Sequence, residues 1–165
     1  MTYYISIKTD RLSIDPLTTN DHQFIRELVN SQGWLQFIGN RNVNSESEAI
    51  AYIQRILDSP TIDYWVVRVN DSHEAVGMVS LVKRDYLPQP DIGFAFLPNH
   101  MGKGYAFEAT KAVMDKLKEL GLFNHFYAIT IPDNESSIRL LDKLGLKFQK
   151  EIEVNQEKLQ LFEMQ

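Results

Sequence analysis

The sequence predicts a mixed α/β fold, in which a mostly antiparallel sheet of about seven strands carries four helices. Three β-rich runs follow one another in the middle of the chain, at residues 64–69, 75–82 and 92–97, and turn residues separate them as in an antiparallel meander. After them the pattern alternates between helix and strand, beginning with a long amphipathic helix at 104–120. The expected order of elements, β-α-α-β-β-β-α-β-α-β-β, therefore joins a meander to a crossover.

The N-terminal third is expected to form one strand and two helices. The strand, residues 11–15, stops at Pro16, because proline has no N–H to donate to a ladder. The first helix carries an apolar stripe with helical spacing and ends near Gly33. The second begins at Ser45, a good N-cap, and ends before Pro60.

The C-terminal third contains a helix with a clear end and a further alternation of elements. Apolar residues recur at helical spacing up to Leu120, and Gly121 supplies the left-handed stop. A second helix is closed by Gly145. The expected elements are a strand at 126–131, this helix at 134–144, and closing strands at 148–154 and 159–162. No repeat or linker interrupts the order, so a single domain, residues 1–165, is expected.

Composition and charge exclude several classes of protein. With 44% hydrophobic and 24% charged residues, the chain has the composition of a globular protein. No apolar stretch approaches the roughly 20 residues that cross a bilayer, and the first residues lack a signal-peptide pattern, so we expect no membrane partner and a cytoplasmic location. The net charge of −5 argues against nucleic-acid binding. A monomer or a homodimer is expected.

Residue counts also argue against a metal site. The chain has no cysteine, which excludes disulfides and thiolate ligands, and its four histidines lack the spacing that places two imidazoles on one helical face. We expect no metal.

The stretch from Ile92 to Ala106 is the first candidate for chemistry. It reads as strand, loop, Gly-x-Gly and helix, and the free N–H groups of a helix start can bind a diphosphate. A dinucleotide fingerprint does not fit, because Phe107 stands where a third small residue is needed; a P-loop does not fit, because Gly104 follows the lysine. The alternative is that the two glycines only shape a turn.

The second candidate stretch runs from Ile131 to Leu146. It contains a polar helix start, with Asn134 as a possible cap and Ser137 in the first turn, and it ends at Gly145. Read alone, this is an ordinary capped helix.

Together the two stretches resemble motifs A and B of the GNAT acetyltransferases. The segment 96–109 is similar to motif A and the segment 134–146 to motif B, in the same order and at similar spacing. The pattern Thr-x-Arg-Leu at 9–12 is similar to the start of the ribosomal-protein N-terminal acetyltransferase (Rim) type. The resemblance spans nearly the whole chain and implies a GNAT-like sheet, splayed at its middle strands, that uses acetyl-CoA.

By this resemblance, backbone amides from Met101 to Phe107 hold the coenzyme A diphosphate, and Phe94 to Phe96 pair with the pantetheine arm as an extra strand. The family usually carries Gln, Arg or Trp where Met101 stands, so one side-chain contact is missing here. The expected cofactor-binding residues are Phe94, Phe96, Met101, Gly102, Lys103, Gly104, Tyr105, Ala106, Phe107 and Asn134.

The resemblance also implies catalytic roles. Asp91 stands where Rim-type relatives often place a Glu, and is the expected general base, with Asp85 as an alternative and an ordinary surface carboxylate as the other reading. Ser137 is the expected proton donor to the thiolate, because Leu141 stands where many members use Tyr. Glu108 matches the family's helix carboxylate and can equally be structural.

The expected activity is transfer of acetyl from acetyl-CoA to a primary amine, at a protein N-terminus or on a small molecule, by direct attack in a ternary complex. Trp34, Phe37 and Tyr86 are expected to line the acceptor pocket, with Trp65 as a further candidate. Two alternatives stay open: a GNAT-like protein that binds acyl-CoA without catalysis, and an unrelated phosphate-binding protein that uses the Gly-x-Gly turn.

Overall fold

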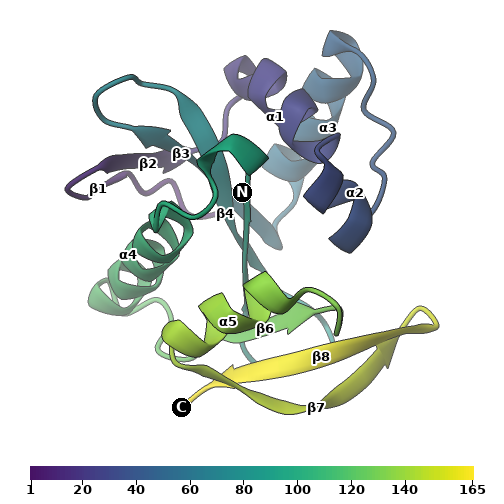
Figure 1. Cartoon of the computed structure of the whole chain (residues 1–165). Helices are drawn as coiled ribbons and strands as arrows, with labels where there is room; N and C mark the ends of the chain where they lie inside the picture. The colour runs from purple at the N-terminus through teal and green to yellow at the C-terminus, as the bar shows by residue number, and fades with distance from the viewer.

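The computed structural model describes residues 1–165 and shows one eight-stranded sheet with helices packed on both faces (Figure 1). The strands are β1 (Ile7–Lys8), β2 (Leu12–Pro16), β3 (Ile62–Val69), β4 (Ala75–Val82), β5 (Asp91–Phe96), β6 (Tyr127–Thr130), β7 (Leu146–Val154) and β8 (Glu157–Met164). The helices are α1 (His22–Val29), α2 (Gln32–Phe37), α3 (Glu46–Asp58), α4 (Tyr105–Glu119) and α5 (Glu135–Lys143), with short 3-10 helices η1 (Thr19–Asp21) and η2 (Pro98–His100).

The sheet opens in its middle. Its strand order is β1-β2-β3-β4-β5-β6-β8-β7, and every pair is antiparallel except β5–β6. That parallel pair is joined at one position, Asp91 opposite Tyr127. Beyond it the two strands diverge, so the edge of β5 from Ile92 to Phe96 has no strand partner on the β6 side.

Two hydrophobic clusters lie on opposite faces of the sheet. In β3, Trp65 and Val67 belong to the cluster under α4 and α5, whereas Val66 belongs to the cluster under α1 and α3. This alternation follows from the two-residue period of a strand. Burial on both faces explains why β3 and β4 read as nearly continuous apolar runs.

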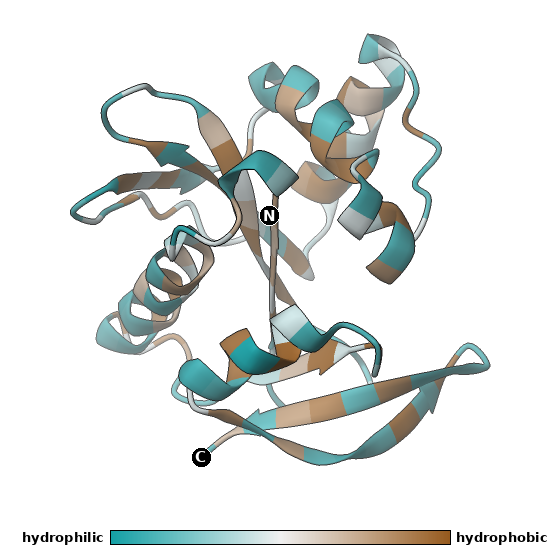
Figure 2. Cartoon of the chain, viewed as in Figure 1, coloured by the Kyte–Doolittle hydropathy of each residue, from teal (hydrophilic) through white to brown (hydrophobic).

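The β7–β8 hairpin closes the chain with a tight turn. Asn155 and Gln156 have φ values of 50° and 66°, the left-handed pair that two-residue hairpins favour. Hydrophobic and hydrophilic residues are interspersed along both strands (Figure 2), but the alternation breaks at the bulge after Phe148 in β7 and at the consecutive Leu161 and Phe162 in β8. Leu161 and Phe162 of β8 are buried, whereas β7 is buried only at Leu146 and is largely exposed at the edge of the sheet.

The predicted fold class is confirmed, with two elements more than the sequence indicated. The two-residue strand β1 is too short to give a pattern. The first helix ends at Val29 rather than near Gly33, because the Ser31 hydroxyl donates to the Leu28 carbonyl (2.6 Å) and a separate helix, α2, follows. Gly33 lies inside α2 and terminates nothing. No helix combines the length and apolarity that crossing a membrane requires.

Candidate active site

The loop before α4 presents a row of free backbone donors. Gly102 and Gly104 have φ values of 77° and 80°, a conformation that other residues adopt at a cost, so both glycines are needed for this path. The first helical bond runs from the Glu108 N–H to the Gly104 carbonyl (3.1 Å), and none of the N–H groups from Gly102 to Phe107 donates within the protein. Such a row suits a phosphate or diphosphate group.

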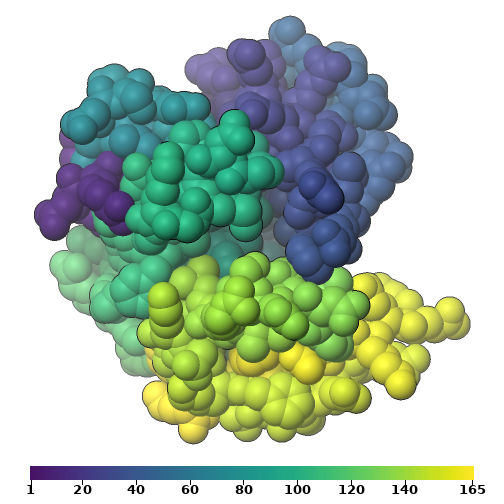
Figure 3. All heavy atoms as spheres, viewed as in Figure 1, coloured from purple at the N-terminus to yellow at the C-terminus, as the bar shows by residue number.

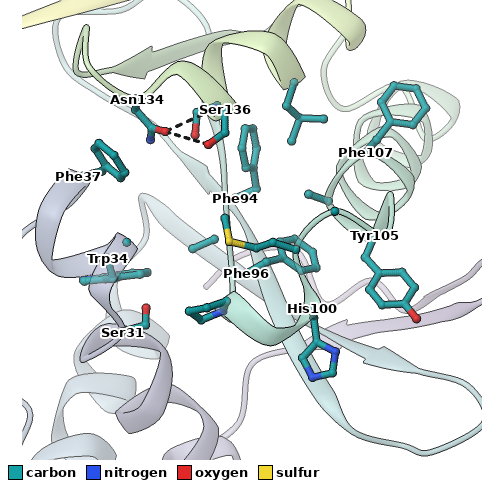
Figure 4. A pocket seen from close by; sticks show the side chains of 18 of the residues that line it. Ser31, Trp34, Phe37, Phe94, Phe96, His100, Tyr105, Phe107, Asn134 and Ser136 are labelled. Atoms are coloured by element: carbon teal, nitrogen blue, oxygen red, sulfur yellow. Dashed lines mark hydrogen bonds between the residues drawn. The ribbon is translucent and has the colours of Figure 1, made fainter.

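A first cavity of about 390 Å³ lies beside this loop, between α2 and α5. The space-filling view shows the hollow between the blue helical segment, the teal loop and the green segment of α5 (Figure 3). Figure 4 shows Trp34 and Phe37 on one side, Tyr105 and Phe107 on the other, and Phe94 between them. The predicted site residues that line it are Trp34, Phe37, Phe94, Phe96, Met101, Gly102, Gly104, Tyr105, Ala106, Phe107, Asn134 and Ser137.

The open edge of β5 forms the floor of this cavity, and a glycine of β4 sets the position of Phe96. A Cβ added at Gly77 would lie 2.3 Å from the Phe96 ring, so only glycine lets the ring cross β4 here. Gly77 and Phe96 are partners in the β4–β5 ladder. A narrow, extended ligand with amide groups could add to β5 as another strand would.

Polar groups at the start of α5 face the same space. Asn134 caps the helix, since its Oδ1 accepts from the Ser137 N–H (3.4 Å) and from the Ser136 hydroxyl (3.3 Å; Figure 4). The Ser137 hydroxyl has no hydrogen-bond partner within the protein, although Ser137 lines the cavity. A proton donor is therefore free at this point.

A second cavity, of about 280 Å³, meets the first at the gap between β5 and β6. The two share Trp34, Phe37, Phe94, Asn134 and Ser137 among their lining residues. Its remaining walls come mainly from β3, β4, β5, β6 and β8, with Leu141 of α5 and the loop residues Arg41 and Arg84. Two ligands can therefore approach each other through the splay of the sheet.

One buried carboxylate lies in this second cavity. Asp91 is only 6% exposed, and the Arg84 Nε donates to its Oδ2 (2.9 Å). Burial raises the pKa of Asp91 to about 6, although the charge and hydrogen bond of Arg84 and the backbone of Ile129 act in the opposite direction. For Arg84, burial alone would lower the pKa, but Asp91 raises it above its usual value. Asp91 can thus exchange a proton near neutral pH. No cluster of three or more histidine or acidic side chains is arranged to hold a metal ion.

The acetyltransferase (GNAT) domain family matches residues 11–147, most of the chain. This chain belongs to the GNAT family. It is accordingly an acetyl-CoA-dependent N-acetyltransferase, and its acceptor is an amine.

Individual GNAT proteins resemble it along almost their whole length. The uncharacterized N-acetyltransferase YoaA of Bacillus subtilis is 30% identical over 152 residues, which cover 88% of this chain and 83% of that protein. A GNAT-family acetyltransferase structure from Bacillus anthracis has a TM-score of 0.80 at 22% identity, and covers 97% of this chain and 98% of its own. RimL, a ribosomal L7/L12 alpha-N-protein acetyltransferase in complex with coenzyme A, has a TM-score of 0.83 at 15% identity, and the match covers 96% of this chain and 97% of RimL. The two structures share the fold with this GNAT enzyme.

Four residues considered from the sequence are absent from the lining of the two cavities. Lys103 is exposed and lines neither, and the same holds for Asp85 and for Tyr86, which is 43% exposed in the β4–β5 loop. Trp65 is fully buried in the core. The roles of Tyr86 and Trp65 as pocket walls and of Asp85 as an alternative base stay predictions. The strand parity of Trp65 directs its side chain into the core cluster under α4 and α5.

Other residues of this GNAT site were not foreseen. Arg84 donates to Asp91, seven residues farther along the chain. The register of β4 and β5 could have indicated this contact, because Val82 pairs with Asp91 and Arg84 lies two residues beyond Val82. His100 and Lys143 line the first cavity and Tyr64 lines the second. No local sequence pattern marks these three residues.

Proposed function

We propose that this GNAT enzyme acetylates a primary amine, at a protein N-terminus or on a small molecule, by direct attack while both substrates are bound. The observation that carries the proposal is that two cavities meet at the gap between β5 and β6 and share Phe94, Asn134 and Ser137. Two substrates in contact need no covalent enzyme intermediate, because proximity alone makes the transfer effectively intramolecular.

The first cavity is the proposed coenzyme site. The free N–H groups from Gly102 to Phe107 would hold the diphosphate at the positive end of α4. The unpaired edge of β5, from Phe94 to Phe96, would hold the amide-containing arm. Acetyl-CoA supplies an acetyl group activated as a thioester, and this arrangement would direct that end toward the shared wall of the two cavities.

The second cavity is the proposed acceptor site, with Asp91 as its base. As the amine nitrogen bonds to the acetyl carbon, the nitrogen must lose a proton, and Asp91 would take it directly or through a water molecule. Its pKa of about 6 leaves it ionised at neutral pH and nearer the working pH than an ordinary Asp. Arg84 would fix the carboxylate through Oδ2, and Oδ1 has no side-chain hydrogen-bond partner.

Ser137 is the proposed partner of the leaving group. As the bond between the acetyl carbon and sulfur breaks, the Ser137 hydroxyl would give its proton to the thiolate and regain one from solvent. Its hydroxyl has no partner in the protein, and its backbone N–H is held by Asn134, which fixes the first turn of α5.

The acceptor end of the site combines aromatic side chains with charged ones of both signs, since Arg41 and Glu157 line the second cavity along with Arg84 and Asp91. Trp34 and Phe37 wall both cavities, and Asp91 is neutralised by Arg84. The similarity of the fold to RimL, an alpha-N-protein acetyltransferase, supports a peptide N-terminus as one candidate acceptor.

A panel of amines tests the proposal. Purified protein is mixed with acetyl-CoA and either peptides with a free N-terminus, small primary amines, or the same peptides already N-acetylated, and released thiol is measured. We expect thiol release with at least one free amine and none with the blocked peptides. Release that is equal with free and blocked peptides would contradict transfer to an amine, and failure to bind acetyl-CoA in calorimetry would contradict the coenzyme site.

A further inference from the structure

The turn between β1 and β2 is tied to the start of α4 by a compact set of contacts. Glu108 accepts from the Thr9 hydroxyl (Oγ1 to Oε2, 2.5 Å), the Arg11 N–H (3.2 Å) and the Arg11 Nε (2.7 Å). The Arg11 Nη1 donates to the Lys103 carbonyl (2.8 Å), and its guanidinium lies 4.6 Å from the centre of the Tyr105 ring. We call these contacts the Arg11–Glu108 clamp.

The clamp is itself fixed to the sheet. The Asn70 side chain donates to the Thr9 carbonyl (3.1 Å), and the Asn70 N–H donates to the Arg11 carbonyl (2.8 Å). The Ser13 hydroxyl holds the Asn70 side-chain oxygen (2.6 Å). The β3–β4 turn thus holds the β1–β2 turn, which in turn holds the loop before α4 (Figure 1).

The clamp contacts the loop before α4 at one backbone group, the Lys103 carbonyl. If α4 began one residue earlier, this carbonyl would accept from the N–H four residues later, that of Phe107. Here Arg11 donates to it and the Phe107 N–H stays free, as do the N–H groups of the residues between them. The contact therefore opposes extension of the helix by one residue, which would remove the Phe107 N–H from the free donor row.

Neither stability nor simple charge explains these contacts. The side chains of Arg11 and Glu108 are 45% and 22% exposed, and ion pairs this accessible contribute little to folding. Partial burial alone would raise the pKa of Glu108, yet the hydrogen bonds from Thr9 and Arg11 hold it below its usual value. An ionised carboxylate in the first turn of a helix that is to bind a diphosphate would repel that ligand.

We propose that Arg11 and Glu108 are positioning residues for coenzyme binding, which hold the Lys103 carbonyl away from the diphosphate and keep the row from Gly102 to Phe107 free to donate. This inference rests on the proposed coenzyme site. It assigns a role to the Thr-x-Arg-Leu segment, which contributes no residue to either cavity.

Coenzyme A affinity, measured by calorimetry, separates positioning from charge. Loss of a nearby carboxylate should strengthen diphosphate binding if only charge matters, whereas loss of the clamp should weaken it. We expect Glu108→Ala and Arg11→Gln each to raise the Kd about tenfold, and the double variant to lose little more than either single one. Arg11→Lys keeps the charge but cannot make both side-chain contacts, so it should fail to restore affinity. In steady-state assays the KM for acetyl-CoA should rise while kcat stays within about twofold.

Controls keep the test decisive. Lys116→Gln removes an ion pair with Glu119 farther along α4 and should keep the parent Kd. Should Glu108→Ala unfold in a thermal melt without ligand, Thr9→Val removes one clamp contact and should still raise the Kd. Parent-like Kd values in the Arg11 and Thr9 variants, or tighter binding by Glu108→Ala, would overturn the clamp. If those variants bind normally while Gly102→Asp does not, only the clamp fails; a parent protein that does not bind coenzyme A refutes both proposals.

Discussion

Replacement of Asp91 by Asn tests both the proposed role of Asp91 as general base and the effect of burial on the pKa of its carboxyl group. Burial moves the pKa of Asp91 from 3.8 to about 6. At about 1.4 kcal/mol per unit, the shift corresponds to about 3 kcal/mol of folding free energy. The folded protein holds this proton to a higher pH than the unfolded chain does. The contribution of Asp91 to stability is therefore greatest below pH 3.8 and decreases as the pH rises to about 6.

Urea unfolding of the parent and of Asp91→Asn at a series of pH values measures this contribution directly. We expect the free energy of unfolding of the parent, minus that of the variant, to fall by up to about 3 kcal/mol between pH 4 and pH 7, and then to level off. Asn has almost the same shape, so the contributions of other groups largely cancel in the difference. A difference that is flat, or that increases with pH, would refute the account of Asp91 as a buried, destabilised carboxylate.

The kinetics of the same variant report on the role of Asp91. Loss of a general base should lower kcat/KM by about 10²- to 10⁴-fold. The loss should be smallest at high pH, where more of the acceptor amine is already deprotonated. The kcat/KM of the parent should itself rise as the pH passes about 6. A change in the acceptor KM alone would show that Asp91 only binds the amine, and parent-like turnover at all pH values would reject both roles.

Two further substitutions test the coenzyme side of the site. A side chain at Gly102 would meet no atom within 4 Å, but the φ of 77° strains any residue other than glycine, so Gly102→Asn is the control that carries this strain without the negative charge of Gly102→Asp. Calorimetry should show a much larger loss of coenzyme A affinity for Asp than for Asn, and equal losses would remove the diphosphate from this loop. Ser137→Ala should lower kcat more than it raises the KM for acetyl-CoA, because a proton given to the thiolate matters mainly in the transition state; a change in KM alone would reduce Ser137 to a binding residue.

Elements with strong local signals could be predicted from the sequence almost to the residue. The helix predicted at 104–120 forms at Tyr105–Glu119, and the strand predicted at 75–82 forms at Ala75–Val82. The Gly-x-Gly loop indicated a helix start with free donors, and the structure has one at that position. Periodicity, caps and glycines act within a few residues, so they are readable from one chain.

Features that depend on tertiary arrangement could not be read in this way. Tyr64 and Trp65 are neighbours in β3, yet the first lines the second cavity and the second is in the core, and only the strand register decides which side chain faces which way. The pair of Arg84 with Asp91 required the pairing of β4 with β5. The contact of Arg11 with Glu108 spans 97 residues, and no local rule brings the two together.

The open edge of β5 has a consequence for the solubility of the folded chain. An unpaired strand edge is a template on which another polypeptide can add, and proteins usually cover or charge such edges to prevent aggregation. Here the exposed groups lie inside the sheet rather than at its border, in a cleft walled by α2 and α5. A neighbouring β-strand would need about 4.8 Å of lateral spacing along with room for its side chains on both faces, which such walls restrict, whereas a thin, unbranched amide chain needs far less. The backbone groups at the open edge of β5 can therefore hydrogen-bond to a thin ligand, whereas a strand of another protein has too little room to pair with them.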